Sequence, residues 1–259
     1  MASAIVAIGD ELVGGYTLDT NSHWLAGRLR AVGRPVKRVV AVRDRLDEIV
    51  EELRRALDDG EIEDVFTSGG LGPTPDDRTA EAVARLLGRD LVTNPLVAAR
   101  IEGRTRLLRE LGVIDDEATL AGRARMARLP ADPDRLLRNR RGTAPGLLFH
   151  IGGKRLFVLP GVPSEMRTIF LDGIEPELRR GAAPATVREL RLAGAMESQL
   201  APIMIALERS HPDVAVGSYP GGDGRPLLIR CTGHDAARVE DAARRVLEAT
   251  AALGITLAP

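Results

Sequence analysis

The sequence is poor in cysteine and in aromatic residues. Its 259 residues include one cysteine, Cys231, and only 3% of them are aromatic. One cysteine can form neither an internal disulfide nor a thiolate cage for a metal, which is typical of a protein of the reducing cytosol. Single-stranded nucleic acids stack on aromatic side chains. The scarcity of aromatics therefore argues against a nucleic-acid partner, although arginines are dense between Arg123 and Arg141.

Long apolar runs and a net charge are also lacking. No run approaches the roughly 20 apolar residues that cross a bilayer, and the opening "MASAIVAIGDEL" is too short and too acidic for a signal peptide. The 36 Lys and Arg residues nearly balance the 37 Asp and Glu residues, which leaves a net charge of -1. We therefore expect a cytoplasmic protein with no nucleic-acid or membrane partner, in which any anion site is local.

Strands and helices alternate in the first part of the chain. Apolar runs predict buried strands at Ala4–Ile8, Val36–Val42 and Asp64–Ser68. Apolar residues spaced by three and four predict a helix after each strand, at about Trp24–Val32, Asp44–Leu57 and Asp77–Leu87. This order predicts a parallel sheet covered by helices on both faces, with ligands at the carboxyl ends of the strands.

The remainder of the chain divides into two parts. Asn94 and Pro95 predict the start of a long arginine-rich helical stretch, Leu147–Leu159 predicts a hairpin that turns at Gly152 and Gly153, and Ser164 could cap one more helix. From about Ile174 the pattern becomes β-α-β-β-α. We therefore predict an α/β domain over residues 1–173 and a small α+β module over residues 174–259.

The segment "GGLGPTPDD" at 69–77 follows a predicted strand and allows two interpretations. Thr74 could be a helix N-cap, with Pro75 first in the helix and Asp76 and Asp77 as ordinary first-turn acids. A cap does not require three glycines, however. A glycine-rich loop before a helix exposes backbone N–H groups that form a cradle for phosphate.

The acids beside that cradle favour a bound cation. At about 4 Å and an effective dielectric of about 20, one carboxylate beside a phosphate costs about 4 kcal/mol. Mg²⁺ would remove this conflict, because it binds one or two carboxylates together with phosphate oxygens. Asp44 and Glu11 also follow predicted strands. Asp44 could instead cap a helix in a capping box with Asp47, but three strands that all end in acids exceed what capping requires.

Four ordered motifs resemble one known family. They are "GDELVGGYTLDTN" (Gly9–Asn21), "TSGGLGPTPDDRTAEAVA" (Thr67–Ala84), "NRRGTAPG" (Asn139–Gly146) and "LPGVPSEM" (Leu159–Met166). These stretches resemble the CinA-type competence/damage-inducible proteins, whose main domain is of the molybdopterin-binding, molybdenum-cofactor-biosynthesis type. The later "AMESQLAPIM" also resembles that family, so the similarity covers nearly the whole chain.

The resemblance implies a three-layer α/β domain with a mostly parallel sheet and a metal-dependent pyrophosphatase activity on ADP-ribose and related dinucleotides. The acids of the related Mog/MoaB proteins fall on Asp44 and Asp77, which we predict as catalytic. Asp44, Asp76, Asp77 and Glu11 are the predicted metal ligands. The predicted phosphate or nucleotide contacts are Gly69, Gly70, Gly72, Thr74, Asn139, Gly142, Pro145 and Gly146.

Further expectations concern the assembly and the histidines. The parent domain type implies a homo-oligomer. Many CinA proteins continue into a C-terminal domain that deamidates nicotinamide mononucleotide, and we do not expect that activity here because the chain stops at Pro259. His23, His150, His211 and His234 show no metal-ligand spacing, so we expect them to be structural or exposed.

The leading hypothesis is a hydrolase that uses Mg²⁺ or a similar divalent metal to cleave the diphosphate of a nucleotide such as ADP-ribose. One alternative is a molybdopterin-binding protein of molybdenum-cofactor biosynthesis, which would use the same acids for a pterin ligand. A second alternative is a nucleotide-binding module without catalysis.

Overall fold

The protein consists of two compact units, Met1–Ala182 and Ala183–Pro259. The computed structural model describes residues 2–113, 117–179, 185–221 and 225–258. The division falls nine residues after the boundary predicted at 173/174. Residues up to Arg179 belong to the first unit because helix α8 (Glu175–Arg179) continues the preceding helical turn and buries Leu178 in the same core as Ile174.

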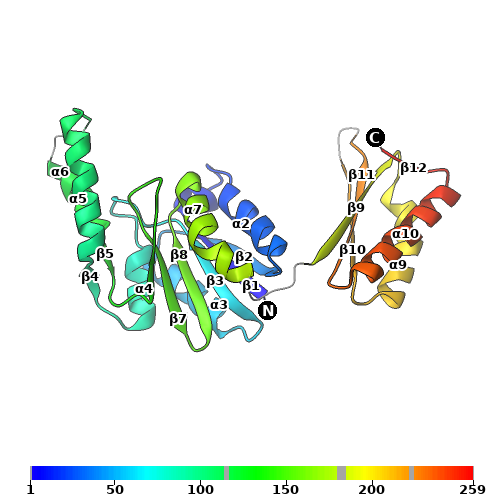
Figure 1. The fold of residues 1–259 in the computed structure, drawn as a ribbon, viewed down its shortest axis with the longest axis horizontal. Coiled ribbons are helices and arrows are strands. Elements are labelled where there is room, and N and C mark those ends of the chain that lie inside the picture. Colours follow the sequence, from blue (N-terminus) through cyan, green and yellow to red (C-terminus); the bar gives the residue numbers. More distant parts are fainter. Residues whose placement is uncertain (1, 114–116, 180–184, 222–224, 259) are drawn as a thin grey trace. The chain divides into compact units, whose positions relative to one another are not determined.

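The first unit is built on a six-stranded, mostly parallel sheet (Figure 1). The strand order is β2 (Val36–Val42), β1 (Ala2–Ile8), β3 (Ile62–Ser68), β8 (Lys154–Leu159), β7 (Gly146–Ile151) and β6 (Arg135–Leu137). Strands β2, β1, β3 and β8 pair in parallel, whereas β7 is antiparallel to both of its neighbours. The β7–β8 hairpin turns at Gly152 and Gly153, both with positive φ, as predicted.

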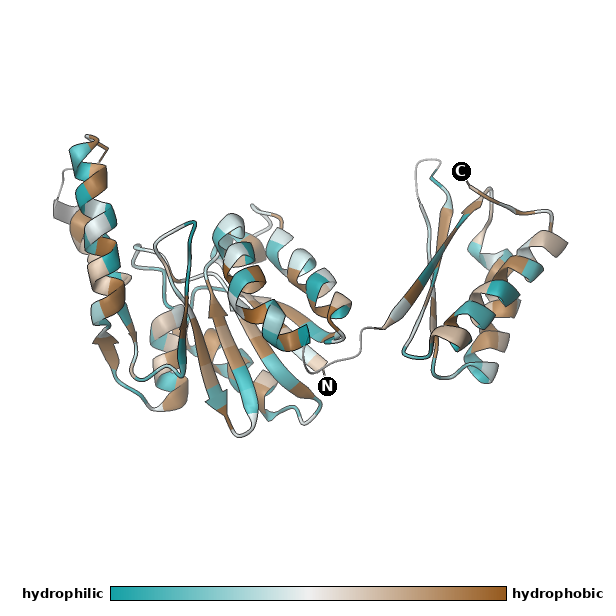
Figure 2. Ribbon diagram, in the orientation of Figure 1, coloured by the Kyte–Doolittle hydropathy of each residue, from teal (hydrophilic) through white to brown (hydrophobic). Residues whose placement is uncertain are grey.

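Helices cover both faces of this sheet. One face packs against α2 (Thr20–Ala31), α7 (Pro163–Ile169), the π-helical turn η1 (Phe170–Ile174) and α8, and the other against α3 (Leu46–Asp58) and α4 (Thr79–Leu87). Figure 2 shows the hydrophobic colour concentrated on the central strands. Because successive strand residues point to opposite faces, the same strands supply two cores. This arrangement confirms the predicted three-layer α/β fold.

Three predicted helix starts differ in the structure. Helix α3 begins at Leu46, two residues after Asp44, and α4 begins at Thr79, two residues after Asp77. Helix α7 begins at Pro163 without a side-chain cap, so Ser164 does not cap it. None of the three predicted side chains caps its helix. Asp44 and Asp77 are therefore available for the roles described below.

A helical arm extends from the first unit, formed by α5 (Pro95–Glu110) and α6 (Glu117–Arg125) (Figure 1). Strands β4 (Leu91–Thr93) and β5 (Arg128–Pro130) pair antiparallel at its base. The side chain of Asn94 accepts hydrogen bonds from the backbone N–H groups of Leu96 and Val97, which confirms the predicted cap. The predicted arginine-rich helical stretch consists of these two helices.

The second unit is a two-layer α+β module. Its antiparallel sheet has the order β10 (Ala215–Tyr219), β11 (Leu227–Gly233), β9 (Thr186–Ala193) and β12 (Thr256–Leu257), and it packs against α9 (Glu197–Ser210) and α10 (Ala236–Ala252). The predicted β-α-β-β-α order is confirmed, with β12 as an addition. Cys231 is fully buried in this core, where burial raises the pKa of its thiol to about 11.

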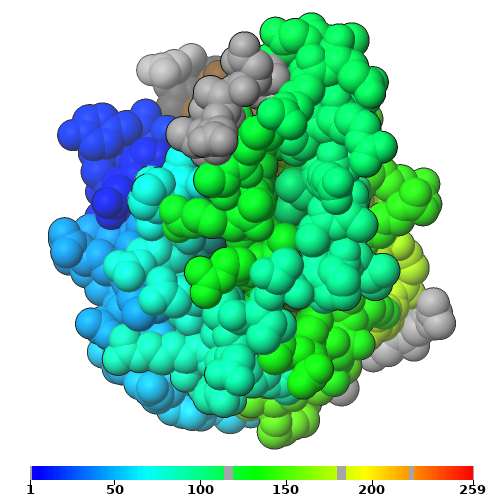
Figure 3. Space-filling model, turned by 90° about the vertical axis from the view of Figure 1, so that its left-hand side faces the viewer, coloured from blue at the N-terminus to red at the C-terminus, as the bar shows by residue number. Residues whose placement is uncertain are grey.

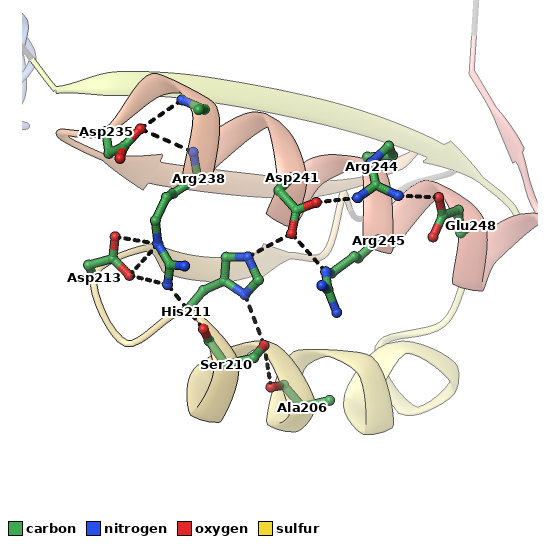
Figure 4. A network of polar contacts seen from close by, with 11 residues as sticks. Ala206, Ser210, His211, Asp213, Asp235, Arg238, Asp241, Arg244, Arg245 and Glu248 are labelled. Carbon is green, nitrogen blue, oxygen red and sulfur yellow. Dashed lines mark hydrogen bonds and ion pairs between the residues drawn. The ribbon is translucent and has the colours of Figure 1, made fainter.

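A polar network fastens α9 to α10 (Figure 4). It consists of His211, Asp213, Arg238, Asp241, Arg244 and Arg245, and we call it the arginine network. His211 is buried, with its Nε2 atom 2.9 Å from Oδ2 of Asp241 and its Nδ1 atom 2.9 Å from Oγ of Ser210. Asp241 also accepts hydrogen bonds from Arg244 and Arg245, and Asp213 accepts from Arg238.

Every acid of this network has an arginine partner. The pKa of Asp241 lies below its ordinary value because Arg245 and Arg244 hydrogen-bond to the carboxylate, and Arg238 lowers the pKa of Asp213 in the same way. His211 is a structural residue here, as predicted for the histidines. Throughout the described ranges, no helix combines the length and the hydropathy that a membrane crossing requires.

Candidate functional site

A cleft of about 520 Å³ opens at the carboxyl ends of four neighbouring strands. Its lining includes Glu11 after β1, Asp44 after β2, the glycine loop 69–72 after β3 and Gly161 after β8. Figure 3 shows the first unit from the side of the helical arm, where the amino-terminal segment (blue) lies beside cyan and green segments. This is the edge of the sheet at which parallel α/β folds bind ligands.

The glycine loop requires glycine because its backbone lies directly against two other elements. Gly69 has φ +115, and a Cβ there would lie 2.1 Å from the backbone oxygen of Ile8 in β1. Gly70 has φ +65, and a Cβ there would lie 2.1 Å from Oγ1 of Thr79. Thr79 in turn donates hydrogen bonds to the carbonyl oxygens of Gly69 (2.8 Å) and Gly70 (3.0 Å). The start of α4 therefore holds the loop in place.

Asp77 closes the glycine loop through its own backbone contacts. Its Oδ1 atom accepts a hydrogen bond from the N–H of Gly72 (2.6 Å), and its Oδ2 atom accepts from the N–H of Thr74 (2.8 Å) and from the Thr74 hydroxyl. Thr74 therefore donates to Asp77 and does not cap α4, so the capping interpretation of this segment is wrong. Both oxygens of Asp77 shape the loop, and Thr74 is exposed outside the cleft lining.

Asp44 ties the end of β2 to a short helix that the sequence did not reveal. Its Oδ2 atom accepts a hydrogen bond from the backbone N–H of Asp10 (2.8 Å), the first residue of α1 (Asp10–Val13). Asp44 does not cap α3, because Arg45 precedes that helix and no side chain caps it. The Oδ1 atom of Asp44 makes no hydrogen bond to any described residue.

The charges around Asp44 are unfavourable to its ionised form. Its pKa is raised, first by burial, which the hydrogen bond from the Asp10 N–H partly offsets, and then by the negative charges of Asp10, Glu11 and Asp76. Within the described chain, neither Glu11 nor Asp44 nor Asp76 forms an ion pair with a Lys or Arg side chain. Acids that repel one another without a compensating cation are a composition that a divalent cation stabilises.

The four predicted metal ligands, Glu11, Asp44, Asp76 and Asp77, all line the same cavity, and we call them the cleft acids; Asp19 and Glu165 line it as well. They do not form a preformed metal cage, since no group of three or more His, Cys, Asp or Glu side chains in residues 2–113, 117–179, 185–221 and 225–258 could hold a metal. The donor set nevertheless fits Mg²⁺. That ion keeps several waters and is usually bound by one or two carboxylates plus substrate phosphates, so a cage is not required.

The loop "NRRGTAPG" contributes two residues to the cleft, Thr143 and Ala144, that the sequence analysis did not predict as contacts. Asn139 is fully buried, and its Oδ1 accepts hydrogen bonds from the N–H groups of Arg141 (3.0 Å) and Gly142 (2.8 Å). Thr143 and Ala144 line the cleft, whereas Asn139 shapes the turn behind them.

The other predicted contacts in this loop have structural positions. A Cβ at Gly142 would lie 1.9 Å from the Glu165 carboxyl, and one at Gly146 would lie 2.8 Å from Ile169. Pro145 lines an adjoining cavity of about 380 Å³, which also contains Gly70, Gly72 and Asp77.

Asn21 is a cleft residue that the sequence analysis missed. Its Nδ2 atom donates to Oγ of Ser68 (2.9 Å) and to the carbonyl oxygen of Gly161 (2.6 Å), which joins α2 to the ends of β3 and β8. Its Oδ1 atom is buried and makes no hydrogen bond. The available signal was its place at the end of the motif "GDELVGGYTLDTN".

A three-layer α/β domain with a glycine loop and acids at its strand ends defines the class of this protein as a small-molecule-binding domain. Residues 4–180 match the family model described as "Probable molybdopterin binding domain". The chain therefore belongs to the molybdopterin-binding, molybdenum-cofactor-biosynthesis family.

The most similar proteins support this assignment and the CinA resemblance. A protein of Aeropyrum pernix is 41% identical over 251 residues, which cover 95% of this chain and 89% of that protein. A CinA-like protein of Chlorobium luteolum is 35% identical over 95% of this chain, which spans only 56% of that protein. The crystal structure of the protein CinA from Thermoplasma acidophilum, a protein of unknown function, matches with a TM-score of 0.58 and 35% identity, over 68% of this chain and 97% of that one.

Proposed function

We propose that the cleft binds a phosphate-bearing small molecule of the pterin or nucleotide type together with a divalent cation such as Mg²⁺. The cleft acids carry this proposal, because they line one cavity beside the glycine loop and Glu11, Asp44 and Asp76 have no cationic partner among the described residues. A bare phosphate would be repelled there. The family description, which refers to molybdopterin, supports a ligand of this chemistry.

The cleft residues would have separate roles in binding the cation and the ligand. Glu11, Asp44 and Asp76 would hold the cation, with the unbonded Oδ1 atom of Asp44 as one ligand. Asp77 would keep the loop closed, since both of its oxygens accept hydrogen bonds from that loop. Gly69, Gly70 and Gly72 would let the phosphate approach the backbone. A bound cation would neutralise charge on the phosphate oxygens and activate water for attack on phosphorus.

Hydrolysis of the diphosphate of a nucleotide such as ADP-ribose is the second part of the proposal. The cleft acids, which could bind a divalent cation, and the similarity to CinA-type proteins favour this reaction. Binding of molybdopterin without turnover is the competing function, and the family description favours it. A cytoplasmic, homo-oligomeric protein stays our expectation for either function.

Purified protein incubated with ADP-ribose and Mg²⁺ tests the proposal. Release of AMP, followed by chromatography, would support hydrolysis, whereas tight molybdopterin binding without AMP release would support the competing function. Failure to bind either ligand with Mg²⁺ would overturn both.

Matched variants locate the site. We expect Asp44→Asn and Asp76→Asn each to weaken cation-dependent ligand binding at least tenfold, an effect of about 1.4 kcal/mol. Asp47→Asn is the control, because Asp47 is an exposed acid of α3 that pairs with Arg85 and lies outside the cleft lining. An equal effect of Asp47→Asn would refute the placement of the site.

A further inference from the structure

Arg123 of α6 reaches the cleft from the helical arm. Its side chain lines the same cavity as Glu11, Asp44 and Asp76. Helix α6 packs directly on the glycine loop at this point, since a Cβ at Gly122 would lie 3.1 Å from the carbonyl oxygen of Pro73. The arm thus supplies a positive charge to a cavity whose other charged lining residues are acids.

One nitrogen of the Arg123 guanidinium is hydrogen-bonded within the arm, and another has no hydrogen-bond partner among the described residues. Its Nε atom donates a hydrogen bond to Oγ1 of Thr105 in α5 (2.8 Å). Its Nη2 atom is buried and has no hydrogen-bond partner among the residues that the structure describes. A buried donor without a partner costs about 1–3 kcal/mol, so such groups are rare unless a ligand or water completes them. The anchored orientation also limits the entropy that Arg123 would lose on binding a ligand.

A second group of arginines adds positive charge near this region. Arg100 of α5 donates to the carbonyl oxygen of Gly142 (2.9 Å), the residue that precedes Thr143 of the cleft lining. Its pKa is lowered by burial and by the nearby charges of Arg138 and Arg104, while Glu165 opposes the shift. The positive charges therefore come from the arm and the 138–142 segment, whereas Glu11, Asp44 and Asp76 follow β1, β2 and β3.

We propose that Arg123 is a ligand-binding residue that contacts a phosphate of the bound molecule through its unpaired Nη2 group. A forked guanidinium can donate two hydrogen bonds to phosphate oxygens, which an ammonium group cannot match. The cation would then neutralise the ligand beside the cleft acids, and Arg123 would bind it from the arm. This inference rests on the proposed function. Arg123 would recognise the phosphate of the ligand and not its base or ring.

The purely structural alternative is that Arg123 only joins α6 to α5 through Thr105. Isothermal titration of the full chain with inorganic pyrophosphate and with ADP-ribose, each with Mg²⁺, separates the two roles. We expect Arg123→Gln to weaken both affinities at least tenfold and Arg123→Lys to weaken them less. Thr105→Ala removes the anchor but keeps the guanidinium, so it should reduce affinity less than Arg123→Gln does.

Arg106→Gln is the matched control, because Arg106 is an exposed arginine of the same arm that pairs with Glu102. It should leave both affinities unchanged. Wild-type affinity in Arg123→Gln would overturn this inference while the proposed function stands. A wild-type protein that binds neither compound would overturn both, and equal losses in Thr105→Ala and Arg123→Gln would assign Arg123 to structure alone.

Discussion

The two units hold their acids in opposite ways. In the second unit, Asp213 and Asp241 accept hydrogen bonds from arginines, and their pKa values are lowered. In the first unit, Asp44 lies among other acids without a cationic partner, and its pKa is raised. Structural carboxylates of this protein are thus neutralised by its own side chains. Glu11, Asp44 and Asp76 have no such partner among the described residues, and the proposed cation would supply the missing counterion.

The two units also position their acids by different means. The arginine network holds its acids through side chains that could be replaced singly. In the cleft, backbone N–H groups hold Asp77 and Asp44 in position. In the glycine loop, Gly69 and Gly70 leave no space for a side chain. A site that depends on backbone geometry should fail when the backbone shifts, whereas a side-chain network should fail in smaller steps.

Gly69→Ala should have the largest effect. The new Cβ would meet the Ile8 carbonyl oxygen at 2.1 Å, and the φ of +115 is one that alanine rarely adopts. We expect a loss of about 3 kcal/mol from the free energy of unfolding of the first unit, together with loss of ligand binding. Urea denaturation measures the first effect and calorimetric titration the second.

Gly103→Ala is the control for that substitution. Gly103 is an exposed residue within α5, where a Cβ meets nothing within 4 Å. This change should stabilise the protein by about 0.5–1 kcal/mol, because alanine favours helix more than glycine does. If both variants had the same stability, the close approach of the glycine loop to β1 would not be the constraint described here.

His211→Ala should have the next largest effect, on the second unit. It removes a buried ring and leaves one oxygen of Asp241 without that partner, so we expect a loss of about 1–3 kcal/mol. The measurement is the unfolding of the second unit, followed by circular dichroism, because the single tryptophan, Trp24, lies in the first unit and its fluorescence would not report the second. His234→Ala, at an exposed position, should change nothing measurable. A wild-type midpoint in His211→Ala would show that the network does not stabilise this unit.

Much of the fold could be predicted from the sequence because it depends on local patterns. The runs Val36–Val42 and Leu147–Leu159 predicted a strand and a hairpin, and the structure confirms them. The domain boundary was placed too early, since the burial of Leu178 against distant residues leaves no local signal.

The candidate site was only partly predictable for the same reason. The rule that strand ends form one edge brought Asp44, Asp76 and the glycine loop together correctly. The contact between Asp44 and the start of α1, and the approach of Arg123 from the arm, join residues far apart in sequence. No spacing rule encodes such contacts.

Variants at Asp44 and Asp241 should respond to pH with opposite signs. Asp241 has a lowered pKa, so its ionised form stabilises the fold above the ordinary value of 3.8. Asp241→Asn should therefore be destabilising at pH 7, and its cost should fade as the pH falls through the lowered folded-state pKa. Thermal unfolding at a series of pH values measures this, and a cost that does not change with pH would contradict it.

For Asp44 the sign reverses. Its raised pKa means that the ionised form is disfavoured in the folded state, a cost present at pH 7 that disappears as the pH falls below the raised value. Without a cation, Asp44→Asn should thus leave stability unchanged or slightly higher at pH 7, while its remaining oxygen still accepts from Asp10. A clear destabilisation at pH 7 would show that Asp44 serves the fold and not a ligand.

The response of stability to Mg²⁺ alone decides between the two interpretations of the cleft acids. A cation at ten times its dissociation constant stabilises the folded state by about 1.4 kcal/mol, or about 3–6 °C for a unit of this size. We expect that shift in the wild type, most of it lost in Asp44→Asn, and none of it lost in Asp241→Asn. Asp241 already has arginines as counterions, so a cation has nothing to neutralise there. If Mg²⁺ stabilised all three proteins equally, the ion would act on the general surface charge, and the contrast between the cleft and the arginine network would have no bearing on function.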